Sequence, residues 1–357
     1  MRGRVGVGIA GLGRSGWDIH ARAFGELADM YNVVAVFDPI EERRLEAALK
    51  FGCKAYHDFD SLIGDDRVEL TVIATPSYLH APQTIRALKA GKKVVCEKPM
   101  AASLEEADNM IEAARNTGGL LTIFQNKRYD PDFLKVKEVI QSGKLGRIVL
   151  VRISSHSFGR RWDWQTLRKL GGGELRNNGP HAIDQALQLF GKEEPEVFCD
   201  LQSTLTLGDA EDHVKIVLTG PQSPTVDIEV TRACAYPQNR WLIMGTQGGL
   251  AGSSSSLEWR YFDPKDLPPR QVVTEPTPDR GYNRDDIPWN EETWQASEDY
   301  MSGSFAFYQG LYNTLRHGAA LGVTPESVRR VMWIIDRCYK IQTGNTKTAS
   351  MPQSFRD

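Results

Sequence analysis

Apolar segments alternate with amphipathic helical segments through the first third of the chain, and this alternation limits its fold more than any other feature. It begins with the apolar run VGVGIAG at 5–11, continues with the helical run SGWDIHARAFGEL, and repeats until the apolar run LLTIF at 120–124. Strands that alternate with helices pair in parallel through right-handed crossovers. The sequence therefore predicts that residues 1–125 form a doubly wound α/β domain around a parallel sheet.

The hexapeptide GLGRSG lies between the first predicted strand and the first predicted helix and fits the pattern G-x-G-x-x-G. In this position Gly11 permits a tight turn, Gly13 lacks the Cβ that would block a pyrophosphate, and Gly16 allows close packing of helix on strand. Arg14 and Ser15 complete the turn, where free N–H groups at the helix N-terminus attract phosphates. The sequence therefore predicts a Rossmann dinucleotide-binding domain.

An acidic residue ends the second predicted strand, YNVVAVFD. Asp38 stands where a carboxylate accepts hydrogen bonds from the adenosine ribose, although an Asp before Pro39 also suits a helix start. A carboxylate here repels the 2′-phosphate of NADP, so the sequence favours NAD. Arg43 and Arg44 lie just downstream and keep NADP open, unless they belong to a solvated helix face.

Length and composition exclude several other classes of protein. The chain has 357 residues, enough for two domains, and its 41% hydrophobic and 25% charged residues suit a soluble globular protein. A net charge of −3 offers no basic excess for nucleic acid, and no apolar run is long enough for a membrane span. The five cysteines are scattered and the histidines form no H-x-x-x-H pair. We therefore expect a cytoplasmic protein with reduced thiols, no signal peptide, no metal, and no nucleic-acid or membrane partner.

The pattern changes after residue 125. A predicted helix at about 131–142 leads into the strand IVLVRISSHS, and segments of alternating hydrophobicity such as DHVKIVLTG and TVDIEVTRA follow. This alternation is typical of antiparallel strands with one covered face. We expect a second α/β domain over residues 126–343 and a polar tail at 344–357. The Ser-, Pro- and Asp-rich segment 253–300 is predicted to be a long insertion.

Two short motifs bring polar groups to places where a ligand is expected. Glu97-Lys98-Pro99 ends a predicted strand, and open α/β sheets bind ligands beyond the carboxyl ends of their strands. An exposed surface lysine is the alternative. The run GGGELRNNGPHAID at 171–184 places His181 in an apolar helix after flexible backbone, which suits either a capped helix or a catalytic site.

These motifs, in this order and spacing, resemble the glucose–fructose oxidoreductase/inositol dehydrogenase (Gfo/Idh/MocA) family over essentially the whole chain. The matching pieces are GLGRSG, ATPSYLH at 74–80, EKP, NKRYDPDF at 126–133, GKLGRI at 143–148 and GGG…GPHAID. The resemblance implies a Rossmann domain followed by an α/β domain with a large, mostly antiparallel sheet. It also implies a homodimer or homotetramer formed through the outer face of that sheet, and substrate binding in the second domain.

The resemblance also implies roles for residues on the cofactor side of the site. Thr75, Pro76 and His80 match the segment that borders the cofactor, although Ser77 stands where asparagine is frequent. Glu97 matches the acid that contacts the nicotinamide ribose.

On the substrate side, Lys98 matches the lysine between the nicotinamide ribose and the substrate hydroxyl, and His181 matches the proton-transfer residue. Asp184 matches an acid that holds a substrate hydroxyl. Asn177 occupies a position where many members carry aspartate, and it lies four residues before His181. On one helix face, the Asn177 amide oxygen would accept from the imidazole ring.

The loop FGRRWDWQTLRKLGGGELR combines tryptophan with positive charge. Trp162 and Trp164 are candidates for stacking on a sugar, and Arg128, in the NKRYDPDF motif, is a further candidate for substrate binding. Five basic residues of the loop would suit a substrate carboxylate or phosphate: Arg160, Arg161, Arg168, Lys169 and Arg176. An oligomer interface or a solvated loop is the alternative.

The expected reaction is reversible hydride transfer between a secondary hydroxyl or ketone of a sugar, cyclitol or sugar derivative and nicotinamide. His181 would be the general base, because imidazole titrates near neutral pH, and Lys98 would stabilise the reacting oxygen. Two alternatives remain: a glycosidase that retains NAD and acts by transient oxidation, and a non-catalytic dinucleotide-sensing regulator. The sequence leaves open the particular substrate, the physiological direction and the oligomer size.

Overall fold

The first half of the chain folds around a six-stranded parallel sheet with the order β3-β2-β1-β4-β5-β6. The computed structural model describes residues 3–278, 280–296 and 301–344, so most of the predicted polar tail lies outside the described residues. The strand order reverses between β1 and β4, which places a ligand crevice beyond their carboxyl ends. The doubly wound prediction is confirmed, with strands β1 (Val5–Ala10), β2 (Tyr31–Phe37), β3 (Lys54–Tyr56), β4 (Leu70–Ile73), β5 (Lys93–Cys96) and β6 (Leu121–Ile123).

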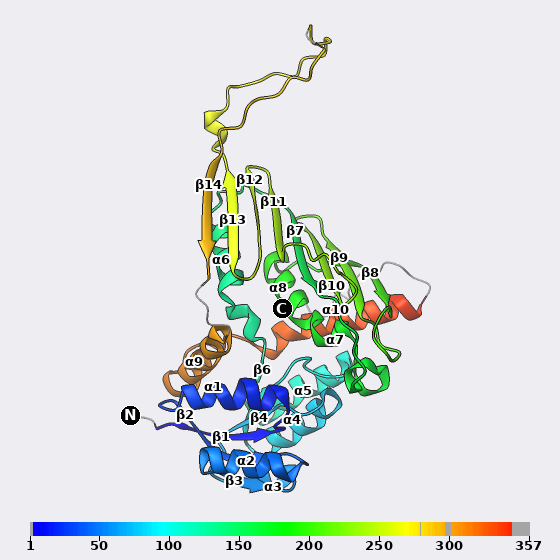
Figure 1. The fold of residues 1–357 in the computed structure, drawn as a ribbon. Coiled ribbons are helices and arrows are strands. Elements are labelled where there is room, and N and C mark those ends of the chain that lie inside the picture. Colours follow the sequence, from blue (N-terminus) through cyan, green and yellow to red (C-terminus); the bar gives the residue numbers. More distant parts are fainter. Residues whose placement is uncertain (1–2, 279, 297–300, 345–357) are drawn as a thin grey trace.

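Helices cover both faces of this sheet (Figure 1). They are α1 (Arg22–Glu26), α2 (Glu41–Phe51), α3 (Phe59–Ile63), α4 (His80–Lys89) and α5 (Leu104–Thr117). The first predicted helix is divided into a π-helical turn, Ser15–Ala21, and α1. The sequence prediction missed β3 and α3, because elements of three and five residues are too short to show a period.

The second half forms an eight-stranded, mostly antiparallel sheet, as expected, with the order β14-β13-β12-β11-β7-β10-β9-β8. Only the described pair β7 and β10 is parallel. Side chains on β8 and β9 alternate between buried and accessible, so one sheet face is covered and the other open. The strands are β7 (Ile148–His156), β8 (Glu196–Gln202), β9 (His213–Thr219), β10 (Thr225–Thr231), β11 (Trp241–Gly245), β12 (Gly248–Gly252), β13 (Ser256–Tyr261) and β14 (Asn290–Gln295).

The helices of this half are α6 (Pro131–Gln141), α7 (Glu174–Asn177), α8 (Gly179–Phe190), α9 (Ser302–His317) and α10 (Pro325–Thr343). Helices α7, α8 and α10 pack on the large sheet, while α9 lies beside α1 of the Rossmann half (Figure 1). On α9, Tyr308 is fully buried among Phe24, Tyr31 and Phe124 of the first half. This aromatic packing fixes the two sheets relative to each other.

The predicted insertion at 253–300 contains two strands that the sequence analysis missed. β13 and β14 pair antiparallel at the sheet edge, and the described residues between them form a long projecting arm (Figure 1). β14 has the sequence NEETWQ, whose polar composition hides the strand pattern. No helix in the described part of the chain is both long and apolar enough to span a bilayer.

Candidate active site

The glycine turn follows β1 and has the shape that a dinucleotide requires. Gly11 has a φ of +90°, a backbone conformation that favours glycine. A Cβ on Gly16 would lie 1.9 Å from the carbonyl oxygen of Gly11, so the helix approaches the strand this closely only because Gly16 lacks one. A Cβ on Gly13 would meet only the Arg43 Nη1 atom, at 4.0 Å. The open space at Gly13 therefore suits a pyrophosphate.

Asp38 is buried beside this turn, and both of its carboxylate oxygens accept hydrogen bonds from main-chain N–H groups. Leu12 N donates to Oδ2 at 2.7 Å and Ile40 N donates to Oδ1 at 2.9 Å. Arg43 Nη1 lies 3.7 Å from Oδ2, and its side chain is partly exposed. Arg44 is buried and donates to the main-chain carbonyl of Asp38, so the solvated-face alternative is wrong for Arg44.

Glu97 is a buried carboxylate that connects the glycine turn to the lysine motif. It accepts hydrogen bonds from Ser15 Oγ and from the main-chain N–H of Lys98, and it pairs with His20 Nε2 at 3.0 Å. Burial alone would raise the pKa of Glu97, but His20, Lys98 and Ser15 together lower this pKa to about 2. His20 in turn bonds to Tyr308 Oη at 2.6 Å. Sequence analysis missed His20, which the π-helical turn directs toward the carboxylate.

His80 bridges the two main-chain segments that follow β4 and β5. Its Nε2 lies 2.9 Å from the carbonyl oxygen of Thr75, and its Nδ1 lies 2.7 Å from that of Pro99. Burial lowers the pKa of His80. Thr75 Oγ1 also donates to Gln83 Oε1 at 2.6 Å, and Pro76 follows at the carboxyl end of β4. The structure thus places this segment beside the crevice.

Lys98 points from the Rossmann sheet toward the second half of the chain. Its Nζ donates to the main-chain carbonyl of Asn177 at 2.8 Å, and the Lys98–Pro99 peptide bond is cis. Burial lowers the pKa of Lys98, Glu97 opposes this effect, and the charge of Arg14 adds to it. A small cavity of about 30 Å³ lies beside the lysine. It is lined by Ser77, Lys98, Pro99, Gln165, Gly171, Gly172, Gly173, Arg176 and Asn177.

His181 lies at the start of α8, buried and oriented by a glutamine. Its Nδ1 lies 3.2 Å from Gln125 Oε1, while the Nε2 of Gln125 donates to the carbonyl of the preceding proline at 3.4 Å. The second bond fixes the amide orientation, so we assign the imidazole proton to Nδ1 and the lone pair to Nε2. Burial holds the pKa of His181 well below its usual value, and the charges of Lys98, Lys127 and Arg240 lower it further. The imidazole is therefore neutral near pH 7.

Asn177 and His181 are both described in the structure, and the predicted hydrogen bond between their side chains is not formed. α7 ends at Asn177 and α8 begins at Gly179, so the i,i+4 relation is interrupted at Asn178. Gln125 takes the expected place beside the ring, and Asn177 instead offers its main-chain carbonyl to Lys98. The sequence could not show this, because Gln125 is distant along the chain.

Asp184 and Arg128 form a buried ion pair with each other. Arg128 Nε and Nη2 donate to the two carboxylate oxygens at 2.7 and 2.6 Å, and Nη2 also donates to Ser327 Oγ at 3.0 Å. Burial raises the pKa of Asp184, and the Arg128 guanidinium opposes that effect. Both oxygens of Asp184 are engaged, so this geometry supports a structural role rather than the expected contacts to substrate.

The tryptophans expected to form a substrate wall face solvent. Trp162 is 77% exposed and Trp164 is 39% exposed, so both are more exposed than a tryptophan packed in the core. Arg176 packs its guanidinium over the Tyr339 ring at 4.5 Å and donates to the carbonyl of Ala102. The structure therefore brings neither tryptophan to the cavity at Lys98, although Arg176 lines it.

Two cations that the sequence analysis did not select lie beside His181. Gln185, one helical turn further along α8, donates through Nε2 to the carbonyl of Lys127 at 2.8 Å. Its Oε1 accepts from Arg240 Nη2 at 2.7 Å. Residues four apart share one helix face, so Gln185 holds the Arg240 guanidinium and the main chain of Lys127 on the face of α8 that carries His181.

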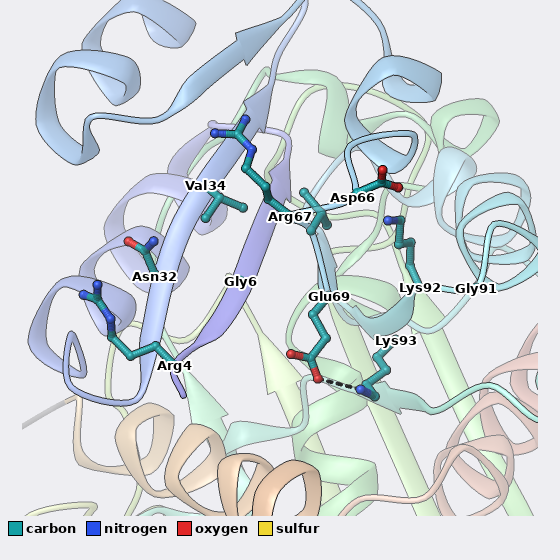
Figure 2. A pocket seen from close by; sticks show the side chains of 11 residues that line it. Arg4, Gly6, Asn32, Val34, Asp66, Arg67, Glu69, Gly91, Lys92 and Lys93 are labelled. Carbon is teal, nitrogen blue, oxygen red and sulfur yellow. Dashed lines mark hydrogen bonds and ion pairs between the residues drawn. The ribbon is translucent and has the colours of Figure 1, made fainter. Parts of the chain in front are cut away.

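A larger cavity of about 680 Å³ lies at the opposite edge of the Rossmann sheet. Figure 2 shows Arg4, Asn32 and Lys93 around it, beside the starts of β1, β2 and β5. Glu69 in this cavity is paired with Lys93 at 2.6 Å. Parallel α/β sheets bind nucleotides at the carboxyl ends of their strands, so this cavity is not the dinucleotide site.

Metal-binding side chains do not cluster in the described residues: no group of three or more His, Cys, Asp or Glu could hold an ion there. The site is therefore built from hydrogen-bonding and charged side chains around a dinucleotide turn.

Comparison with known proteins supports this description. Residues 5–125 match the model of the oxidoreductase family with an NAD-binding Rossmann fold (GFO_IDH_MocA), and residues 133–251 match the GFO/IDH/MocA C-terminal domain. The chain is 32% identical over 259 residues to an uncharacterized oxidoreductase of Schizosaccharomyces pombe, which covers 69% of each chain. It is 28% identical over 351 residues to the scyllo-inositol 2-dehydrogenase (NADP(+)) of Bacillus subtilis, covering 93% of this chain and 92% of that one.

A solved structure shares the fold across both halves. Levoglucosan dehydrogenase in complex with NADH and levoglucosan superposes with a TM-score of 0.82 at 21% identity, covering 98% of this chain and 100% of that one. The dinucleotide turn, the two-sheet architecture and these relatives lead to one conclusion: this chain belongs to the Gfo/Idh/MocA family and is an NAD(P)-binding oxidoreductase.

Proposed function

We propose that this protein transfers hydride between a secondary hydroxyl, or the corresponding ketone, of a sugar or cyclitol and NAD. The observation that carries the proposal is the meeting of Lys98 and His181 at the carboxyl edge of the Rossmann sheet. Lys98 donates to the residue where α7 ends, and His181 lies in the first turn of α8. A cation and a neutral imidazole are the groups that alcohol oxidation needs.

The chemistry follows from the protonation of the two side chains. Gln125 holds the Nδ1 proton of His181, so Nε2 is free to accept the hydroxyl proton as the alcohol is oxidised. The Lys98 ammonium stabilises the negative charge that develops on the same oxygen. A bound nicotinamide supplies the hydride acceptor in oxidation and the donor in reduction.

Four groups hold Lys98 in place for this reaction. Glu97 bonds to its main-chain N–H, while Ser15 and His20 hold the Glu97 carboxylate. His80 contacts the carbonyl of Pro99, directly after the lysine. These bonds limit the movement of the lysine, so little reorganisation is needed when charge develops.

NAD is the proposed cofactor. The proposal is supported by the buried Asp38 carboxylate directly after β2, because an acid at this position of a Rossmann domain accepts hydrogen bonds from the adenosine ribose. We also propose a homo-oligomer formed through the open face of the large sheet. Phe198 and Met244 are apolar side chains on that face and are about half exposed.

A cytoplasmic location is the proposed compartment. All five cysteines are unpaired in the structure, which suits the reducing conditions of the cytoplasm.

The test is a panel of sugars, inositols, uronates and glycosides offered with NAD or NADP, while NADH absorbance and free-sugar release are followed in parallel. We expect NADH formation without sugar release, and loss of turnover with retained NAD binding in Lys98→Met and His181→Ala. Full activity of His181→Ala would refute its role. Hydrolysis without net NADH would indicate the glycosidase, and NAD binding without any turnover the regulator.

A further inference from the structure

We propose that the substrate carries an oxyanion, a carboxylate or a phosphate, and that Arg240 and Lys127 bind it beside His181. The proposal rests on the proposed function and names the substrate class for that site. The cations of the loop that contains Trp162 do not fill this role, since Arg161 is paired with Asp163 and Arg176 packs over Tyr339.

Gln185 on helix α8 contacts both of these residues. Gln185 is fully buried, and it lies four residues after His181 on the same helix face. Its amide donates to the main chain of Lys127 and accepts from Arg240, at 2.8 and 2.7 Å. One glutamine thus holds the Arg240 guanidinium and the main chain of Lys127 on the helix that carries the proposed base.

Arg240 is oriented in advance and retains a free edge. Its Nε donates to Asp132 Oδ2 at 3.2 Å, Nη2 donates to Gln185, and the guanidinium lies 5.2 Å from the Trp241 ring centre. Trp241 Nε1 shares the same Asp132 oxygen at 2.8 Å. Nη1 has no partner among the residues that the structure describes. An arginine held at two nitrogens with a third available suits recognition of an oxyanion.

Lys127 is the second cation of the proposed site and is only weakly paired. Its Nζ is 3.7 Å from Asp130 Oδ2, beyond hydrogen-bond distance, and its side chain is 40% exposed. The segment that carries it also holds Gln125, the partner of the His181 ring. Lys127 therefore has an ammonium available close to the reacting groups.

Positive side chains act on His181 from two parts of the chain besides Lys98. Burial lowers the pKa of His181 most, and the charges of Lys98, Lys127 and Arg240 lower it further. The nearby acids already face cations or donors. Asp132 accepts from Arg240 and Trp241, and Asp130 lies 3.7 Å from the Lys127 ammonium. Glu97 contacts Ser15 and His20, and Glu174 accepts from Arg232. Arg240 Nη1 and the Lys127 ammonium keep donor capacity beside these pairs, and an anionic substrate offers the acceptors for it.

Matched substrates test the proposal with the full-length enzyme and NAD. Each neutral sugar is compared with its uronate and its 6-phosphate, for example glucose, glucuronate and glucose 6-phosphate, with galactose and mannose series beside it. We expect one anionic member to exceed its neutral partner in kcat/KM by about 30-fold or more, as charged hydrogen bonds allow. Whether the uronate or the phosphate is preferred distinguishes the two sources of the oxyanion.

Two variants assign the effect to the proposed residues. Arg240→Gln and Lys127→Gln are expected to lower the anion-to-neutral ratio of kcat/KM about 10-fold or more each, mainly through KM. Lys127→Gln does not remove a well-formed hydrogen bond, so it remains informative if Arg240→Gln folds poorly. The control is Lys89→Gln, at an exposed lysine on α4, which should leave the ratio unchanged.

The outcomes separate this inference from the proposed function. Oxidation of neutral sugars with no anionic preference would overturn the inference and leave the proposed function standing. Calorimetric binding of an anionic sugar that is lost in Lys127→Gln, without turnover, would support the inference and contradict the proposed function. A preference removed by Arg160→Gln but not by the two variants would also overturn the inference, as would a panel in which no compound binds or reacts.

Discussion

Replacing Gln125 with glutamate puts a carboxylate where the amide oxygen now lies, 3.2 Å from His181 Nδ1. The pKa of His181 is low because burial and neighbouring cations disfavour the imidazolium. A negative charge at this distance favours the imidazolium and reverses part of that effect. Oxidation needs the neutral ring, so its rate rises with pH as the imidazolium loses its proton. We therefore expect Gln125→Glu to move the acidic limb of the pH–rate profile upward by about one to three pH units.

A second variant separates charge from orientation. Gln125→Leu removes the bond to His181 and the 3.4 Å bond to the carbonyl of Pro180. At about 0.5–1.5 kcal/mol for each hydrogen bond, the expected loss in kcat is about 5- to 150-fold. In this variant the acidic limb should not rise, because no negative charge is added.

The assay is NADH formation from pH 5 to 10 with the best substrate of the panel, with thermal unfolding as a check that each variant folds. An acidic limb that stays in place in Gln125→Glu would refute the assignment of His181 as the base. Wild-type kcat in Gln125→Leu would refute the orienting role of Gln125.

Three further predictions follow from the geometry. Gly13→Ala should keep the wild-type melting temperature but weaken NAD binding measured by calorimetry, because the alanine Cβ enters the pyrophosphate space. Gly16→Ala should lower the melting temperature, because the alanine Cβ would lie 1.9 Å from the carbonyl oxygen of Gly11. Asp184→Ala should lower the free energy of unfolding by about 3–5 kcal/mol in urea titrations, because it leaves the largely buried Arg128 without its carboxylate partner. A smaller loss of stability together with reduced substrate affinity would favour a substrate contact instead. Asp38→Ser should raise kcat/KM for NADP relative to NAD, and an unchanged ratio would contradict the cofactor assignment.

The Rossmann half was predictable because its determinants are local in the sequence. The glycine turn, the acid after the second strand and the alternation of strands with helices each have a period or spacing that one chain reveals. β3 and β14 were missed for different reasons. β3 has only three residues, and β14 is too polar to show the alternation of a strand. The strands of the large sheet depend on pairing between distant segments, which local patterns show only in part.

The sequence selected candidate reacting groups for the site but could not show their partners. The motifs indicated Lys98 and His181, and in the structure Lys98 Nζ contacts Asn177 and His181 contacts Gln125. The partner of His181 is Gln125 rather than Asn177, because a break between α7 and α8 separates residues that a continuous helix would bring together. Arg240 is distant from His181 in the sequence, and only the folded chain connects it to the His181 helix through Gln185.

Transfer of deuterium tests the central claim most directly. The best substrate of the panel is deuterated at its reacting carbinol carbon and incubated with NAD and the wild-type enzyme, and NADH is analysed by mass spectrometry and NMR. We predict that deuterium appears at C4 of the nicotinamide, and that Lys98→Met and His181→Ala bind NAD but transfer little of it. Substrate consumption without deuterium at C4 of the nicotinamide would contradict the assignment of this protein as a hydride-transferring dehydrogenase.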